Sequence, residues 1–418
     1  MSFLLKIALR NITRNKFRTF VSILAIAVVV AIVVFTRGLL LGFSESTFRL
    51  IVDNQSGHVR IINEEYKNRE ALIPLDQTVD GFRGEGLAAM LADLKEVTGV
   101  EHMLPRLKFG AIASPGDEMI TMMGIGIDPG SEAEYGALTK DITAGRMVED
   151  GREILVGKSL LDKLDIELGE RITILFSDAY QSFQGRTFTV VGVRETGLKM
   201  MDEAMFYLPL AEAQQMLYLD DEATEIMVFG SGIREAEQLK ENLTDFFVAQ
   251  GADDKFAVLA WQETDPFIEY FQIAVRIYDV IYVFFILLGS IVLINTMIMI
   301  IRERTAEIGM MGALGLKSRD ILKVFSLEGA IMGIFGSLLG VIPGGMITYY
   351  FSQVGLDYYA DMLDDMEILI APAIYPVFSL ENLFISFLFG AVITTLVSIW
   401  PARKAAQMEP VDALHREI

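Results

Sequence analysis

Four stretches of the chain are apolar over lengths that fit a lipid bilayer. A hydrocarbon core about 30 Å thick takes roughly 20 residues of α-helix to cross. Arg37 is the one charge within the first stretch, and Glu328 is the one charge within the third. The hydrophobic pattern therefore predicts four transmembrane helices, at residues 20–41, 280–301, 324–351 and 383–400.

Two of these helices are expected to extend beyond the bilayer. Pro266 suits the first turn of a helix, and apolar residues recur at helical spacing from there to Tyr282. The 36 residues from Pro266 to Ile301 make about 54 Å of helix, so roughly 24 Å would project from a 30 Å core. The first helix shows a similar pattern as far as Asp53. A two-helix stalk is predicted, and a flexible linker with an interfacial turn is the alternative.

Residues 54–265 contain strand-like and helix-like patterns in alternation. Strand-like runs include 58–62, 119–127 and 187–194, and helix-like runs include 86–98 and 233–249. About 210 residues are enough to bury a substantial core. We expect a mixed α+β domain between the first two transmembrane helices, with a strand pairing that the sequence does not reveal.

Charge is segregated along the 418-residue chain, whose net charge is −21. Residues 1–41 hold six basic and no acidic residues, whereas residues 42–276 hold 21 basic and 42 acidic ones. Basic residues also flank the predicted spans at 302–323 and at 403–404, and such clusters mark the cytoplasmic side of a membrane. Both termini are therefore expected in the cytoplasm, and the acidic α+β domain outside it.

The first apolar helix is expected to remain uncleaved. A signal peptide is disfavoured, because no small-residue cleavage pattern of the Ala-x-Ala kind follows its apolar run.

The expected organisation has nine segments. The segments are a cytoplasmic amphipathic helix (1–19), transmembrane helix 1 with its stalk extension (20–53), the extracytoplasmic α+β domain (54–265), stalk and transmembrane helix 2 (266–301), a cytoplasmic loop (302–323), transmembrane helix 3 (324–351), an extracytoplasmic loop (352–380), transmembrane helix 4 (381–400) and a cytoplasmic tail (401–418).

Several kinds of chemistry are disfavoured. The absence of cysteine excludes disulfides, thiol catalysis and cysteine-based zinc sites, and a pI near 4.6 argues against nucleic-acid binding. The run from Gly151 to Ser159 resembles a phosphate-binding loop but has five residues between its glycines, where that motif has four. We expect neither an enzyme nor a metal or cofactor site in this chain.

Two features of the sequence, a glycine row in the third span and an acidic loop, can each be interpreted in two ways. Gly336, Gly340 and Gly344 recur every fourth residue of the third span, which favours close helix packing in lipid over a substrate groove. The loop at 352–380 carries a group of carboxylates, which is interpreted as a solvated acidic rim, with divalent-cation binding as the alternative. These carboxylates are Asp357, Asp361, Asp364, Asp365 and Glu367.

The loop after the second span carries the most specific motif. From Arg304 it reads R-T-A-E-I-G-M-M-G-A-L-G, and the chain later reads P-A-R-K-A-A-Q-M-E-P-V-D-A-L from Pro401. Both strings resemble the signatures of the FtsX-like ABC transporter permeases, the family that includes MacB and the lipoprotein-releasing permeases LolC and LolE. The resemblance implies a membrane α-helical fold with a MacB-like extracytoplasmic α+β domain between helices 1 and 2.

The resemblance also implies a partner ATPase, which would bind ATP and Mg²⁺, since this chain has no nucleotide-binding motif. Residues 305–316 would then form a coupling helix that seats in that ATPase, and a plain connector is the alternative. The residues implied in coupling are Glu307, Ile308, Gly309, Met310, Ala313, Leu314 and Gly315.

Motifs at residues 156–158, 190–193 and 208–214 look most like the lipoprotein-releasing subgroup. The hairpin at 180–186 is short and lacks proline, which resembles LolE or a single-permease variant more than LolC. The implied function is ATP-driven extraction of acylated lipoproteins from the bacterial inner membrane, by a homodimer or a pair of similar permeases, with delivery to a periplasmic carrier and the outer membrane. The rival functions are MacB-like efflux of peptides or toxins and FtsX-like regulation of an extracytoplasmic hydrolase.

An apolar surface near the outer membrane boundary is the expected place for acyl chains. It would combine residues of the first and second helices, and ordinary lipid contact or packing between spans is the alternative for them. They are Phe35, Leu39, Leu40 and Phe43 on the first helix and Phe271, Tyr278, Tyr282 and Phe285 on the second.

Overall fold

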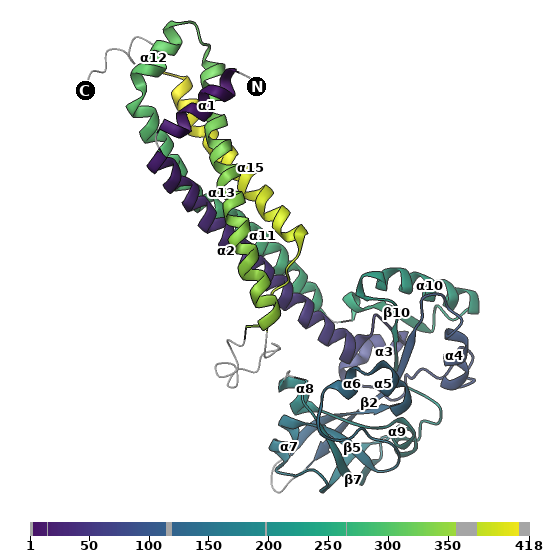
Figure 1. Ribbon diagram of the computed structural model, residues 1–418. Helices are drawn as coiled ribbons and strands as arrows, with labels where there is room; N and C mark the ends of the chain where they lie inside the picture. Colours follow the sequence, from purple (N-terminus) through teal and green to yellow (C-terminus); the bar gives the residue numbers. More distant parts are fainter. Residues whose placement is uncertain are drawn as a thin grey trace. The chain divides into compact units, whose positions relative to one another are not determined.

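The chain forms two compact units, a helical unit and a sheet unit (Figure 1). The helical unit spans Met1–Glu45, Phe271–Asp357 and Ala373–Ile418, and the sheet unit is built on Ser46–Tyr270. This computed structural model describes residues 3–14, 16–113, 119–196, 199–264, 266–356 and 374–408. The acidic side chains expected at 357–367 and the end of the C-terminal motif at 409–414 lie outside the described residues.

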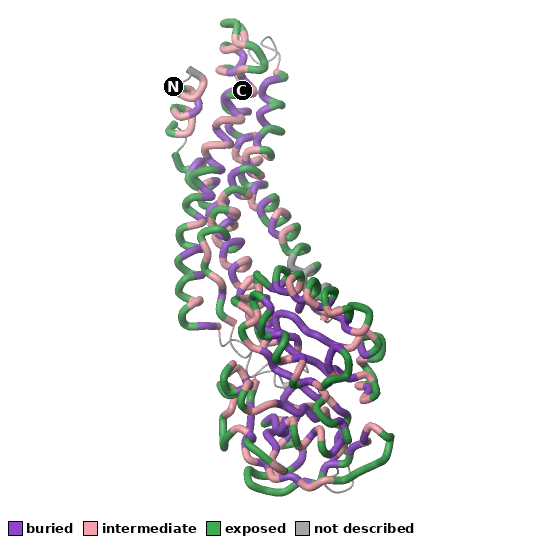
Figure 2. The backbone as a smooth tube through the Cα atoms, turned by 90° about the vertical axis from the view of Figure 1, so that its right-hand side faces the viewer, coloured by how far each residue is buried: buried purple, intermediate pink, exposed green. Residues whose placement is uncertain are grey.

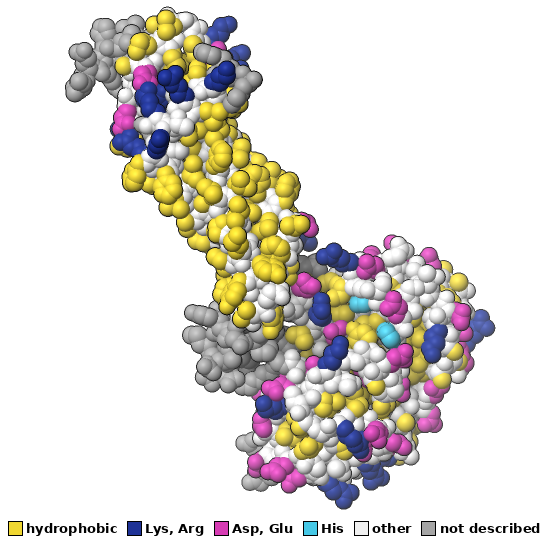
Figure 3. Space-filling model, in the orientation of Figure 1, with side chains coloured by type: hydrophobic (Ala, Val, Ile, Leu, Met, Phe, Trp, Pro, Cys, Tyr) yellow, Lys and Arg dark blue, Asp and Glu magenta, His cyan; other side chains and the backbone are white. Residues whose placement is uncertain are grey.

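Among the described residues, four long helices are apolar and long enough to cross a membrane. Hydrophobic side chains cover the middle of the helical unit, and Lys and Arg gather at the end that bears α1 and α12 (Figure 3). The helices of this unit are α1 (Phe3–Arg14), α2 (Lys16–Ile51), α11 (Pro266–Glu303), α12 (Thr305–Ala313), α13 (Ser318–Val354) and α15 (Leu380–Ala406).

Glycines let α13 approach two of its neighbours closely. A Cβ on Gly340 would lie 2.5 Å from the Ala27 carbonyl oxygen, and Gly336 and Gly344 also face α2. On another face of α13, Gly329 lies against Ser398 of α15. The three-glycine row of the third span is therefore in contact with the first span.

A mixed sheet organises the sheet unit, with ten strands among its described residues. The order is β10-β1-β9-β2-β3-β8-β5-β7-β4, and β6 pairs with β2 and β7. Neighbours are antiparallel except for the β3–β8 and β5–β7 pairs. The strands are β1 (Val59–Asn63), β2 (His102–Ala113), β3 (Ile120–Ile127), β4 (Ile142–Gly145), β5 (Glu153–Gly157), β6 (Arg171–Ser177), β7 (Phe183–Arg194), β8 (Met205–Pro209), β9 (Glu225–Phe229) and β10 (Phe256–Ala260).

The long strand β2 joins two hydrophobic cores. Its first half pairs with β9 and its second half with β6. One core includes Phe109 and Phe188, and the other includes Met90 and Phe247; buried residues follow the strands of this unit (Figure 2). The covering helices are α3 (Glu64–Arg69), α4 (Leu87–Leu94), α5 (Pro129–Tyr135), α6 (Ala137–Lys140), α7 (Lys158–Leu164), α8 (Lys199–Ala204), α9 (Leu210–Leu217) and α10 (Ala236–Gln250).

The fold predicted from the sequence is confirmed at the level of class. Four apolar helices accompany an α+β domain inserted after the first of them. The strands expected at 58–62 and 119–127 appear within a residue of β1 and β3. The helix expected at 86–98 is shorter, because α4 ends at Leu94 and Gly99 turns the chain toward β2 with a φ of +94°.

Candidate functional site

Helix α12 forms a compact turn between α11 and α13. The Leu314 N–H donates to the Met310 carbonyl at 2.9 Å, and the Gly315 N–H donates to the Gly312 carbonyl at 3.0 Å. Gly315 has a φ of +95°, a conformation that glycine adopts without the steric cost of a side chain. The chain then turns into α13, which begins at Ser318. The predicted coupling segment is therefore a short helix closed by a glycine.

The predicted coupling residues divide between two faces of α12. Ile308 is buried among Ile301, Ile321, Phe325 and the end of α15, and Gly309 is also buried. In contrast, Met310 is 52% exposed and Leu314 is 82% exposed, and Ala313 and Gly315 are exposed as well. Ile308 therefore anchors the helix, while Met310 and Leu314 present apolar side chains that a partner can bury.

Glu307 fixes the orientation of α12 through two arginines. Its Oε1 accepts from Arg14 of α1 at 2.6 Å, and its Oε2 accepts from Arg304 at 2.8 Å. The hydrogen bond from Arg14, followed by that from Arg304, holds the pKa of the Glu307 carboxyl below its usual 4.5. A second pair, Arg18 with Glu303, links α2 to the end of α11.

Asn11 bridges α12 to the third span. Arg304 donates to Asn11 Oδ1 at 2.6 Å, and the Asn11 amide donates to the Glu328 carboxylate of α13. Arg304 and Glu328 are both buried, and their nearest charged atoms are 3.9 Å apart. The contact joins residues 317 positions apart in the chain. The sequence motifs did not predict this network. The spacing of one helical turn between Arg304 and Glu307 is the one local signal of it.

The residues predicted to contact acyl chains do not form one surface, because some are buried against other helices and others are exposed. The Phe35 ring lies 5.7 Å from the Phe351 ring of α13, whereas Tyr282 is buried against Val33. Tyr278 and Phe285 are exposed, and Leu39, Leu40 and Phe43 are partly buried. The side chain of Phe271 lies outside the described residues.

Phe35 also lines an apolar groove between α2 and α13, of about 520 Å³. Hardly any polar atom lines this groove. Its walls are Phe20, Ile23, Leu24, Ala27, Val28, Ala31, Ile32 and Phe35 of α2, and Leu339, Pro343 and Ile347 of α13.

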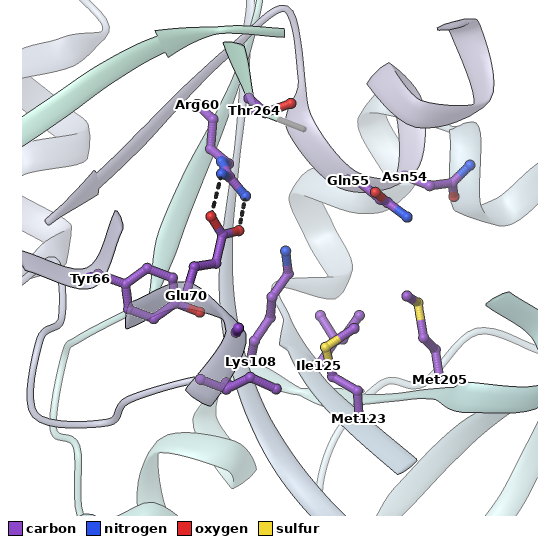
Figure 4. Close-up of a pocket in the computed structure, with 12 residues that line it drawn as sticks. Asn54, Gln55, Arg60, Tyr66, Glu70, Lys108, Met123, Ile125, Met205 and Thr264 are labelled. Carbon is purple, nitrogen blue, oxygen red and sulfur yellow. Dashed lines mark hydrogen bonds and ion pairs between the residues drawn. The ribbon is translucent and has the colours of Figure 1, made fainter. Parts of the chain in front are cut away.

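A separate cavity of about 280 Å³ lies in the sheet unit (Figure 4). Arg60 donates to both oxygens of Glu70, at 2.6 and 3.0 Å, and Lys108 Nζ donates to Glu225 at 2.8 Å. Burial lowers the pKa of Lys108, and the Glu225 carboxylate partly offsets this effect. The charged residues that line the cavity are thus paired, Arg60 with Glu70 and Lys108 with the buried Glu225 behind it. Within the described ranges, no group of three His, Asp or Glu side chains could hold a metal ion.

Two family models match the chain. The model described as the FtsX-like permease C-terminal matches residues 280–410, and the MacB-like periplasmic core domain matches residues 19–246, more than half of the chain. The chain belongs to the FtsX/MacB-like family of ABC transporter permeases. The family predicted from the two sequence motifs is thus confirmed.

Among curated relatives of this permease is a lipoprotein-releasing system transmembrane protein LolC of Neisseria meningitidis. It is 22% identical over 98% of this chain and 97% of its own length, and the LolC of Xylella fastidiosa matches at the same level. The macrolide export ATP-binding/permease protein MacB of Campylobacter jejuni is 25% identical over 56% of this chain, which spans 35% of that protein. The expected likeness to LolE rather than LolC stays a prediction.

Among solved structures, the periplasmic region of MacB from Actinobacillus actinomycetemcomitans matches 52% of this chain and 95% of its own length. The sequence identity is 16% and the TM-score is 0.36.

Proposed function

We propose that this permease couples ATP hydrolysis by a separate ATPase subunit to the extraction of lipoproteins from the inner membrane for delivery to the outer membrane. The observation that carries the proposal is the match to two lipoprotein-releasing transmembrane proteins along nearly the whole of both chains. The match to the macrolide exporter covers 35% of that protein. In this proposal the permease is non-catalytic and works as a homodimer or beside a homologous permease.

The exposed face of α12 is the proposed contact with the ATPase. Met310 and Leu314 would enter a groove of the partner, because exposed apolar side chains on a helix are the usual anchors of such docking. Glu307 ties α12 to α1, and Arg304 and Asn11 tie it to α13. A push on α12 would therefore move α1, α11 and α13 together instead of bending a loop.

The same end of the helical unit is proposed to lie in the cytoplasm. Basic residues gather there (Figure 3), and positively charged flanks are retained on the cytoplasmic side. Both termini would then be cytoplasmic, and the sheet unit periplasmic.

The groove between α2 and α13 supports the acyl-chain part of the proposal. Moving acyl chains out of a bilayer costs about 0.8 kcal/mol per CH₂ that loses its apolar surroundings. The groove that Phe35 lines, of about 520 Å³, runs along the predicted first span, so it would keep an acyl chain in apolar surroundings at the start of transfer. A periplasmic carrier would then receive the lipoprotein.

A second candidate function is MacB-like efflux of peptides or toxins from the periplasm. It is favoured by the match of the MacB-like periplasmic core domain over residues 19–246. The two functions differ in cargo, since one moves an acylated protein and the other a soluble molecule.

Reconstitution with the partner ATPase separates the two functions. We expect ATP-dependent release of a triacylated lipoprotein from proteoliposomes when a carrier protein is present, and no release when ATP is replaced by a non-hydrolysable analogue. ATPase stimulation by a peptide toxin, with no lipoprotein release, would favour efflux instead.

A further inference from the structure

The first long helix ends inside the sheet unit in an unusual turn. Helix α2 is α-helical to Ile51, and Val52–Ser56 form a π-helical turn before β1. The turn is closed by Gly57, whose N–H donates to the Val52 carbonyl at 2.9 Å and whose φ is +63°. π-Helical turns are rare, and they occur frequently at functional sites.

Two buried arginines bind one residue of this turn. Arg106 of β2 donates from Nη1 to the Asn54 carbonyl oxygen at 2.5 Å, and Arg194 of β7 donates from Nη2 to the Asn54 side-chain oxygen. Each arginine is 1% exposed. The Asn54 amide donates back to the Leu50 carbonyl of α2 at 2.9 Å. Asn54 thus connects the end of α2 to two different strands.

The arginines are themselves fixed by partners on other elements. Arg106 donates twice to Oε1 of Glu132 in α5, at 3.0 and 2.8 Å. Arg194 donates to Asp141 at 2.9 Å and to the Tyr207 hydroxyl of β8 at 2.6 Å. These hydrogen bonds therefore hold the turn against both β2 and β7.

The stability of the fold does not require buried arginines and carboxylates around Asn54. Replacing a buried ion pair by well-packed apolar residues is often neutral or stabilising, so apolar residues could fill the same space. What charged hydrogen bonds add is a fixed direction, since apolar contact is non-directional. The turn also has room to shift, because Asn54 and Gln55 line the 280 Å³ cavity (Figure 4).

We propose that Asn54, Arg106 and Arg194 form a rigid joint that passes movement of α2 to the sheet unit. This inference rests on the proposed function, in which ATP-driven movement of the helices acts on the sheet unit. The joint prevents the end of α2 from turning into the neighbouring cavity, so that displacement of the helix becomes displacement of the sheet.

The variant Asn54→Ala tests the joint with little risk to folding. It removes the side-chain acceptor of Arg194 but leaves Asp141 and Tyr207 bound to that arginine, and it leaves the backbone carbonyl that Arg106 binds. Asn54→Asp keeps an oxygen acceptor for Arg194 and loses only the donation to the Leu50 carbonyl, so it should keep the arginine contact and the narrow distance distribution of the parent. Asn242→Ala is the matched control, because Asn242 also donates to a backbone carbonyl of the sheet unit, that of Thr98, at a site away from the turn.

The first measurement does not depend on transport. The chain has no cysteine, so spin labels attach only at introduced cysteines, here at Ser46 on α2 and at the exposed Asp162 on α7. In the full-length permease in lipid nanodiscs, we expect a narrow distance distribution for the parent, Asn54→Asp and Asn242→Ala, and at least a twofold broader one for Asn54→Ala. Equal widths in Asn54→Ala and the parent would overturn the joint.

The second measurement is lipoprotein released per ATP hydrolysed. We expect Asn54→Ala to lower this ratio several-fold while ATPase activity is retained, and the two comparison variants to keep it. An unchanged ratio beside a broadened distribution would refute the transmission role. A parent that releases no lipoprotein would refute the proposed function, while the spin-label result would still decide whether the joint is rigid.

Discussion

Glu307 uses both of its carboxylate oxygens within the helical unit. Arg14 takes one oxygen and Arg304 the other, so this acidic residue of the family motif holds α12 in place. Charge-assisted hydrogen bonds of this kind are the stronger ones. The motif residues therefore have two roles, since Glu307 and Ile308 position the helix and Met310 and Leu314 are available to a partner.

Acidification should loosen the contact of α1 with α12, while Asn11 of α1 keeps its hydrogen bonds to Arg304 and Glu328. The pKa of Glu307 is lowered by its arginines, so its ion pairs stabilise the contact above its usual pKa of 4.5, and the stabilisation is lost as the pH falls through the lowered value. A spin label at the exposed Lys6 of α1 should be less mobile at pH 7 than in acid. In Glu307→Gln the label should already have the higher mobility at pH 7 and should change no further in acid. A parent-like pH response of that variant would contradict the assignment.

Leu314→Asp should prevent stable binding of the ATPase. Leu314 is 82% exposed, so the substitution leaves the fold of the permease intact, whereas an apolar anchor at the centre of an interface contributes about 2 kcal/mol or more, or roughly 30-fold in affinity. Co-purification with the ATPase measures the effect. Leu72→Asp is the control, because Leu72 is also exposed but lies in the sheet unit. Equal yields from both variants would remove Leu314 from the interface.

At the scale of elements, α13 is the central helix of the helical unit. One row of its glycines faces α2 and another faces α15, so its contacts use backbone surfaces that larger residues would separate. In lipid, such close packing replaces the hydrophobic effect as the source of helix association. The contact with α2 also sets the walls of the apolar groove at Leu339 and Pro343.

Gly340→Ala should destabilise the helical unit. Its new methyl group would lie 2.5 Å from the Ala27 carbonyl oxygen, and overpacking of this kind costs about 1–3 kcal/mol. Gly110→Ala is the control, because no atom lies within 4 Å of a Cβ built there. We expect a lower unfolding temperature in detergent for Gly340→Ala alone. A normal unfolding temperature would mean that α2 and α13 are further apart than the structure places them.

Local patterns predicted the elements but not their partners. Hydropathy was sufficient to predict the four apolar helices, because the length and apolar character of a span depend only on the residues within it. The bond between Asn11 and Glu328 joins positions 317 residues apart, and no local pattern carries that information. Arg106 and Arg194 look like ordinary charges on exposed strands, and only the fold reveals that both are buried around Asn54.

At the scale of the whole molecule, the acidic composition and the hydropathy belong to different parts of the chain. Residues 42–276 hold 42 of the 56 acidic residues, and most of them fold into the sheet unit. The four apolar helices give the chain its mean hydropathy of +0.41. An acidic domain repels anionic lipid headgroups, so under the proposed function the apolar groove of the helical unit is the better surface for an acylated cargo.

This separation of charge also predicts an orientation that can be measured directly. Because the chain lacks cysteine, single cysteines can be placed at Lys317, between α12 and α13, and at Asp162 in the sheet unit, both of which are exposed. The basic end of the helical unit should stay on the cytoplasmic side of the membrane. In cells whose outer membrane is permeabilised and whose inner membrane is intact, a membrane-impermeant maleimide should label Asp162→Cys. It should label Lys317→Cys only after the inner membrane is disrupted. The reverse pattern would place the sheet unit in the cytoplasm, where it could not hand a lipoprotein to a periplasmic carrier.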